Sequence, residues 1–224
     1  MKKIFSLLYI IIALPLFSSA GSVSLNTFPN NRIHVSVSSL SELRKFQTIR
    51  QKYDFSCGGA ALTTVLRYQY GLALSEEQVV QSMLINGDQE LIKKRGGFSL
   101  LDLKRYANAL GFNAVGYKLD LESLQAVGLP VIIPIQWFGF RHFVVFRGYR
   151  DRHVVLADPS WGNLTMREED FVKSWDNGIA FVIYSLSDPF IVNRMAVQDK
   201  ELIFLRDEQL AQMVRQNINF ATRR

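Results

Sequence analysis

The sequence predicts an α+β domain in which helices near the N-terminus pack on a largely antiparallel β-sheet. Two observations carry this prediction. Segments with helical periodicity come first, over residues 57–110, and strand-like segments then follow one another over residues 112–185. Hydrophobic residues make up 48% of the 224 residues. That content supplies a core without disulfides or metals, and the length suits one domain with a tail.

The first twenty residues have the composition of a secretory signal peptide. Lys2 and Lys3 give a basic start, residues 4–17 are almost entirely apolar, and small residues lead up to Ala20. A membrane-spanning helix needs about 20 apolar residues, so this run is short for one. We therefore expect residues 1–20 to be a signal peptide that exports the protein to the periplasm, with an uncleaved anchor as the alternative.

Residues 21–44 are expected to form a lead-in segment. Residues 21–31 are polar and rich in turn formers, which predicts a flexible stretch. Ile33, Val35 and Val37 then alternate with polar residues, which predicts a short strand. Residues 40–51 are expected to approach the domain as a turn and loop.

Two helices with clear ends open the domain. Residues 57–70 carry apolar side chains near a spacing of 3.6, and Gly71 supplies the usual C-terminal glycine. The second helix begins at Ser75, because Gln78 three positions later completes the pattern of a capping box. It is expected to run to about Ile85.

A third helix and the strands follow. We expect a polar loop over residues 86–98, then a helix that is capped by Ser99 and closed by Gly111. Beyond it the sequence alternates or becomes rich in β-branched residues. The predicted strands lie at 112–117, 131–137, 142–149, 153–157, 164–166 and 179–185, and short helices are predicted at 120–127 and 168–175.

Residues 186–224 are expected to form an amphipathic helical tail. Apolar side chains alternate with charged ones over residues 200–216, which suits a helix that packs on the domain or on a partner. Acidic residues offset the nearby basic ones, so membrane binding is the less favoured role. Membrane contact is expected only through the signal peptide, or weakly through this tail.

The charge balance excludes some partners. The chain has 26 basic and 20 acidic residues, and removal of residues 1–20 takes away two lysines and no acid. The remaining positive charge is mild, and no basic block with interleaved aromatic residues occurs. We therefore expect no nucleic-acid binding. The sequence predicts no cofactor and no metal site.

Cys57 is the single cysteine of the chain, so it has no partner for an internal disulfide. Such a residue is either a small buried hydrophobic side chain or a reactive thiol. Its place at the start of a predicted helix favours the reactive thiol, because a helix N-terminus stabilises the thiolate. Gly58 and Gly59 follow, and we expect them to let a substrate backbone approach closely.

A thiol nucleophile needs a base, and three histidines are candidates. His34 and His153 lie in contexts that predict surface positions, whereas His142 begins an apolar strand. Asp158 ends the next strand. If residues 150–152 form the turn between the two strands, His142 and Asp158 lie at the same end of a hairpin. The alternatives are a core-edge histidine and an aspartate that only forms a turn.

Gln51 is the fourth candidate. It lies six residues before Cys57, so its amide can reach the thiol and donate to an oxyanion. The alternative is a solvated loop glutamine.

The ordered set Gln51…Ser56-Cys57-Gly58, then His142-Phe143-Val144-Val145, then Asp158-Pro159-Ser160-Trp161-Gly162 resembles the C39 family of papain-like cysteine peptidases. The resemblance covers roughly residues 45–185. It implies a papain-like fold with the cysteine on a helix and the histidine and aspartate on an antiparallel sheet. By position it makes Cys57 the nucleophile, His142 the base, Asp158 its orienting group and Gln51 the oxyanion donor.

The resemblance also bears on substrates. The best-known members are peptidase domains of bacteriocin exporters, which cut leader peptides after a Gly-Gly pair. They usually carry Asp directly before the cysteine, where this sequence has Ser56. Stand-alone exported relatives occur beside secretion and functional-amyloid assembly systems, and such a system is the partner that the resemblance implies.

The sequence thus predicts an exported cysteine peptidase that cleaves a peptide or protein substrate through a Cys57 thioester. Two alternatives stay open. One is a non-catalytic peptide-binding accessory of a secretion system, and the other is acyl or amide transfer by the same residues, because an amine can resolve a thioester in place of water.

Overall fold

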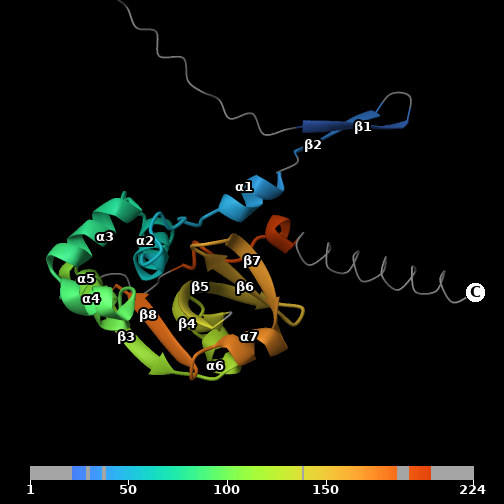
Figure 1. Ribbon diagram of the computed structural model, residues 1–224. Helices are drawn as coiled ribbons and strands as arrows, with labels where there is room; N and C mark the ends of the chain where they lie inside the picture. The colour runs from blue at the N-terminus through green and yellow to red at the C-terminus, as the bar shows by residue number, and fades with distance from the viewer. Residues whose placement is uncertain (1–21, 29–30, 37–38, 138, 186–191, 203–224) are drawn as a thin grey trace, which may run out of the picture. The chain divides into compact units, whose positions relative to one another are not determined.

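The computed structural model of this protein describes residues 22–28, 31–36, 39–137, 139–185 and 192–202 (Figure 1). The chain divides into two compact units, residues 1–39 and residues 40–224. The predicted signal peptide lies outside the described residues.

The first unit contains a β-hairpin. Strand β1 (Ser22–Phe28) pairs antiparallel with β2 (Asn31–Ser36), and Val23 lies opposite Val35. The strand predicted from Ile33 onward is therefore present. The flexible stretch expected before it is instead a strand, because Val23 and Leu25 alternate with serines as regularly as the residues of β2 do.

Three helices of the second unit begin where the sequence predicts. They are α2 (Cys57–Tyr68), α3 (Glu76–Ile85) and α5 (Leu100–Ala109). Ser75 forms the predicted capping box with Gln78, and Ser99 forms another with Asp102. In the described part of the chain, no helix has the length and apolar content needed to cross a bilayer.

Two short helices form where we expected loops. Helix α1 (Leu40–Lys45) buries Leu43, and α4 (Gln89–Arg95) lies inside the predicted loop 86–98. The Asp88 carboxylate caps α4, and Gly96 ends it in the left-handed conformation at φ 73°. Each of the two holds only two large apolar residues, Leu40 and Leu43 in α1 and Leu91 and Ile92 in α4, so periodicity alone does not separate them from loops.

The sheet has six strands in the order β3-β8-β4-β5-β6-β7, and every neighbouring pair is antiparallel. Its strands are β3 (Asn113–Lys118), β4 (Val131–Trp137), β5 (Phe140–Arg150), β6 (His153–Asp158), β7 (Gly162–Arg167) and β8 (Ile179–Tyr184). The predicted short helices are α6 (Leu121–Ala126) and α7 (Glu168–Ser174). The α+β class predicted from the sequence is confirmed.

Helices cover both faces of the sheet, and the core therefore has two layers. Figure 1 shows α2, α3, α4 and α5 gathered on one side of the domain. Along β4, Ile132 belongs to the cluster that includes Leu62 of α2, whereas Ile133 belongs to the cluster that includes Phe171 of α7. This alternation is the period of a strand. The members of both clusters are buried. Burial of each large apolar side chain stabilises the fold by about 1.5–3 kcal/mol.

Residues 192–202 pack on the domain through a buried charge. Arg147 of β5 donates from Nε to the carbonyl of Met195 at 3.0 Å and from Nη2 to Glu201 at 3.1 Å. Glu201 lies in a single 3-10 turn (Asp199–Leu202). The helix predicted over residues 200–216 falls almost entirely outside the described residues.

Candidate active site

Cys57 is the first residue of α2, as predicted, and its thiol is only partly buried. The free backbone N–H groups of the first helical turn therefore lie beside the sulfur, where they favour a negative charge. The two glycines that follow are buried rather than open to a substrate. A Cβ on Gly58 would lie 3.1 Å from Phe143, and one on Gly59 would lie 2.7 Å from Val80. Our expectation for these glycines is wrong: they let α2 pack closely on β5 and α3.

His142 and Asp158 meet at one end of a hairpin. Strands β5 and β6 are joined by a turn at Asp151 and Arg152, which both adopt positive φ. This turn places the start of β5 beside the end of β6. His142 Nε2 lies 2.9 Å from Asp158 Oδ1, and Asp158 is fully buried. The hairpin geometry predicted from the sequence is confirmed.

The same carboxylate also organises the turn after β6. Asp158 Oδ1 accepts the backbone N–H of Ser160 at 2.6 Å and that of Trp161 at 3.1 Å. Its second oxygen, Oδ2, is buried and has no hydrogen-bond partner among the described residues. The aspartate is therefore a turn former and a histidine contact at once.

His142 holds its proton strongly. Burial of the ring lowers the pKa of His142, but hydrogen bonds to Asp158 and Cys57, together with their negative charges, outweigh burial and raise the pKa to about 9. Since Asp158 contacts Nε2, Nδ1 is the ring nitrogen left to face the thiol. At neutral pH the His142 ring beside the Cys57 sulfur therefore favours its protonated form.

Gln51 is fixed beside this pair from three directions. Its backbone N–H donates to the carbonyl of Pro159 at 2.9 Å, and its side-chain oxygen accepts the Ser160 hydroxyl at 2.8 Å. Its side-chain nitrogen donates to the carbonyl of Tyr53 at 3.0 Å. An amide nitrogen carries two protons, so one of them remains for an oxyanion. The oxyanion role itself stays a prediction.

One cleft of about 650 Å³ brings the four predicted residues together. Its other lining residues are Asp54, Arg95, Gly96, Trp137, Gly139, Phe140, Arg141, Ser160 and Trp161. The sequence did not predict the aromatic residues of this cleft, Trp137, Phe140 and Trp161. Phe140 is 76% exposed and Trp161 is 65% exposed. Exposed aromatic residues next to a candidate histidine and aspartate are the signal that would have found it.

The other two histidines lie elsewhere along the chain. His153 lies at the other end of the β5–β6 hairpin, with Nδ1 2.7 Å from the carbonyl oxygen of Asp151. His34 lies in β2, in the other unit of the chain.

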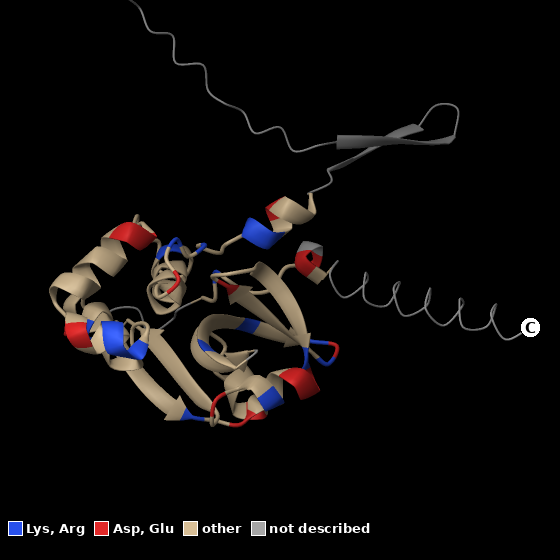
Figure 2. Cartoon of the chain, in the orientation of Figure 1, with Lys and Arg blue, Asp and Glu red and all other residues tan. Residues whose placement is uncertain are grey.

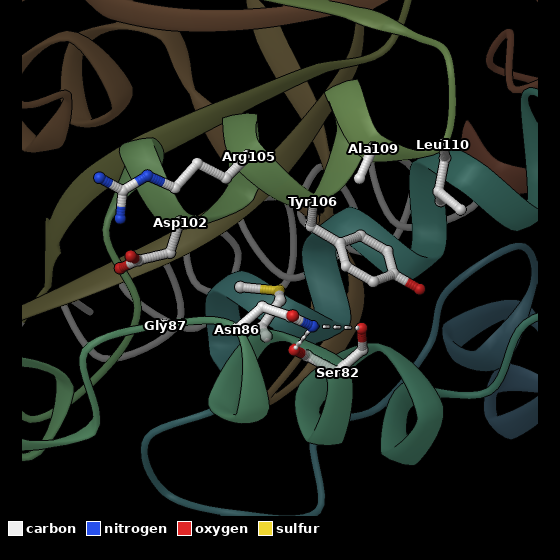
Figure 3. Close-up of a pocket in the computed structure, with 9 residues that line it drawn as sticks. Ser82, Asn86, Gly87, Asp102, Arg105, Tyr106, Ala109 and Leu110 are labelled. Carbon is white, nitrogen blue, oxygen red and sulfur yellow. Dashed lines mark hydrogen bonds between the residues drawn. The ribbon is translucent and has the colours of Figure 1, made fainter.

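A smaller pocket of about 260 Å³ lies between α3 and α5 (Figure 3). Asn86, at the end of α3, donates to the carbonyl of Ser82 at 2.8 Å, and Tyr106 of α5 lies across the pocket from this pair. None of the nine residues that line it is a cysteine or a histidine. The residues that line this pocket therefore do not include the Cys–His pair of a thiol nucleophile and its base.

Comparison with known proteins agrees with this geometry. The model of the peptidase C39 family matches residues 45–185. A protein of Pseudomonas fluorescens described as a probable functional amyloid protease, FapD, is 40% identical over 167 residues, which are 74% of this chain and 73% of that protein. The protein of the same description from Pseudomonas aeruginosa is 34% identical over 178 residues, covering 79% of this chain and 78% of its own length.

A solved structure extends the comparison to the fold. The crystal structure of a double glycine motif protease from an AMS/PCAT transporter, in complex with the leader peptide, is 29% identical to this chain. The two superpose with a TM-score of 0.52 over 62% of this chain and 90% of that one.

Proposed function

The chain belongs to the peptidase C39 family and is a cysteine peptidase, and we propose that it cleaves a protein of a functional-amyloid assembly system outside the cytoplasm. One observation carries the proposal: a thiol at a helix N-terminus, a histidine and a buried aspartate converge in a single cleft. The family has a papain-like fold, and the sheet and helices of this chain agree with it.

The proposed reaction begins with the Cys57 thiolate and the His142 imidazolium. The sulfur attacks the scissile carbonyl carbon, and the carbonyl oxygen becomes an oxyanion that accepts a hydrogen bond from the free N–H of the Gln51 amide. His142 then gives its proton to the amide nitrogen as the carbon–nitrogen bond breaks, which leaves a thioester on Cys57 and releases an amine.

Water completes the cycle. His142, now neutral, takes a proton from the water that attacks the thioester carbonyl. The carbon–sulfur bond breaks, the carboxylic acid leaves, and the thiolate and imidazolium are restored. Asp158 takes no proton in this scheme. It keeps the ring of His142 in place and stabilises the charged form.

The choice of substrate rests on the relatives. Both Pseudomonas proteins are described as functional amyloid proteases, and the more similar of these two is 40% identical to this chain. The solved transporter protease was captured with a leader peptide. These similarities support a peptide segment of an amyloid-system protein as the substrate. The basic and apolar composition of residues 1–20 supports export and hence a periplasmic site of action.

The proposal is tested by labelling the Cys57 thiol and by following the processing of the substrate. Iodoacetamide should label Cys57 rapidly at neutral pH, and Cys57→Ala should abolish processing of the exported proteins that are encoded beside this gene. The measurement is their mass and new N-terminus in cells that carry each variant. His153→Ala is the matched control and should leave processing unchanged.

Two outcomes would redirect the proposal. Normal processing in the Cys57→Ala strain would favour the peptide-binding accessory. A product whose mass includes an added amine, rather than water, would favour acyl transfer.

A further inference from the structure

Glu76 is an acidic residue at a helix start that is buried instead of solvated. It is the first residue of α3, and only 2% of its surface is exposed. Its neighbour Glu77 lies on the surface, where it pairs with the Lys52 side chain. Figure 2 shows the acidic colour of this first turn of α3. Burial of a carboxylate is costly unless hydrogen bonds replace its water, so the partners of Glu76 need an explanation.

Those partners belong to the segment that leads into the nucleophile. The backbone N–H of Lys52 lies 3.1 Å from Oε1 and 3.2 Å from Oε2 of Glu76, and the Ser56 hydroxyl donates to Oε1 at 2.5 Å. Lys52 directly follows Gln51, and Ser56 directly precedes Cys57. One carboxylate therefore holds the loop 51–56 by hydrogen bonds near both of its ends.

Hydrogen bonds inside this loop connect the residues held by Glu76 to the Gln51 amide. The carbonyl of Tyr53 accepts both the backbone N–H of Ser56 at 3.1 Å and the side-chain nitrogen of Gln51 at 3.0 Å. The Ser56 hydroxyl also accepts the backbone N–H of Tyr53 at 3.3 Å. A shift of Ser56 would thus move the carbonyl that holds the Gln51 amide.

The opposite side of the loop is tied to the turn after Asp158. Pro159 and Ser160 hold Gln51 by its backbone and by its side-chain oxygen. Glu76 supplies the second anchor, on the α3 side. Together the two anchors hold the loop that runs from Gln51 to the residue before Cys57 from both sides.

We propose that Glu76 is a positioning residue that sets the oxyanion donor against the nucleophile through Lys52 and Ser56. The inference rests on the proposed function, because it assumes that Cys57 attacks and that Gln51 donates. A displacement of about 1 Å in such a constellation can cost on the order of a hundredfold in rate. The sequence alone does not reveal this role, because it depends on a contact between segments 20 residues apart.

The experiment separates attack from oxyanion stabilisation with two probes. Iodoacetamide reacts with the thiolate and needs no oxyanion donor. A short peptide aldehyde adds to the thiol as a hemithioacetal, whose oxygen occupies the oxyanion position. Both are applied to the wild-type protein and to Glu76→Gln, which replaces one acceptor oxygen by a donor. Glu77→Gln is the matched control.

We expect Glu76→Gln to weaken aldehyde binding at least about tenfold, because a buried hydrogen bond of the loop is lost, and to change the iodoacetamide rate by less than about threefold. Glu77→Gln should match the wild type with both probes. Ser56→Ala should weaken aldehyde binding in the same way, and it carries the test if Glu76→Gln does not fold.

The outcomes distinguish the two proposals. If Glu76→Gln and Ser56→Ala bind the aldehyde as tightly as Glu77→Gln does, the positioning role is wrong. An equal loss with both probes, in step with a loss of folded protein, would make Glu76 merely structural and would also overturn it. A wild-type protein that reacts with neither probe would instead refute the proposed function.

Discussion

Asp158 couples a backbone turn to the orientation of His142 through a single oxygen. Oδ1 contacts the ring and accepts two backbone N–H groups of the following turn. Any change that loosens this turn therefore also loosens His142. The turn holds Gln51 as well, so two of the other three candidate residues, His142 and Gln51, depend on this one buried carboxylate.

Catalysis should decline as the pH rises through about 9. His142 must donate a proton to the leaving amine, and the pKa of His142 is raised to about 9. Asp158→Asn should move this decline to lower pH, because it removes the charge that helps to hold the proton. The measurement is the pH dependence of kcat/KM on a cleaved peptide. A decline at the same pH in both proteins would contradict the pairing.

The free energy of unfolding should also depend on the protonation of His142. The pKa of His142 is about 9 in the folded protein and about 6.5 in an unfolded chain, so the folded state binds the proton more tightly. The contribution of His142 is fully present below about pH 6.5 and is lost as the pH rises through about 9. Urea unfolding across this interval should show a falling free energy of unfolding, with a shallower fall for His142→Ala.

The sequence predicts those candidate residues whose positions follow from short-range spacing along the chain. The turn at residues 150–152 is enough to bring His142 and Asp158 together, and the helix start identifies Cys57. Glu76 and Ser160 were out of reach. Their contacts join segments 20 and 109 residues apart, and no local pattern distinguishes them from an ordinary helix start and an ordinary turn.

At the scale of elements, the close approach of α2 to α3 depends on the absence of a side chain at Gly59. Val80 of α3 is only 3% exposed, and its methyl group occupies the space that a Cβ would need. The glycine costs α2 some intrinsic helix propensity, about 1 kcal/mol relative to alanine. Packing outweighs that cost here, since a well-packed core tolerates added volume poorly.

Gly59→Ala should therefore destabilise the protein by about 1–3 kcal/mol, the usual cost of overpacking. Gly116→Ala is a suitable control, because no atom lies within 4 Å of a Cβ at that position. Adding Val80→Ala should recover part of the loss by making room. Chemical unfolding of these three variants and of Val80→Ala alone tests this, and additive effects of the Gly59 and Val80 substitutions would show that the two do not compete for space.

Elements with a capping box or a long apolar stripe were predictable from the sequence, whereas the short helices α1 and α4 were not. The capping boxes at Ser75 and Ser99 mark their helices in the sequence itself. Helix α4 is held by one aspartate cap and by a glycine at its end, within a segment whose polar residues read equally well as a loop. The expectation for residues 21–31 failed for the opposite reason, since turn formers near Pro29 concealed the alternation before them.

At the scale of the molecule, the folded body extends past the region that the family model matches. Residues 192–202 lie beyond residue 185, yet they supply the partner of a charge inside the domain. The side chain of Arg147 is fully buried and that of Glu201 is 1% exposed. Asn163 of β7 contacts the same guanidinium at 3.3 Å.

Glu201→Ala should cost about 3–5 kcal/mol of unfolding free energy, because it leaves Arg147 buried without its countercharge. Asp199→Asn, two residues earlier on the surface, should cost less than about 0.5 kcal/mol. Urea unfolding measures both. If Arg147→Met combined with Glu201→Leu restores most of the stability, the loss came from the unpaired charge. A small effect of Glu201→Ala would show that water reaches Arg147.

The fold class and sheet were predictable from the order of helices and strands, because that order restricts the possible topologies. The attachment of residues 192–202 was not. Nothing near Glu201 in the sequence indicates that its carboxylate is buried, and the contact spans 54 residues. Long-range polar contacts of this kind belong to the tertiary structure alone.

The Arg147–Glu201 pair also sets an order of events during synthesis. Arg147 lies near the middle of β5, and β5 sits between β4 and β6 in the sheet. A nascent chain that stops short of residue 201 holds this arginine without its countercharge, in the same strand that carries His142. Assembly of the peptidase is thus tied to delivery of the chain as far as residue 201, and a chain truncated before that residue should be an unstable peptidase rather than an active one.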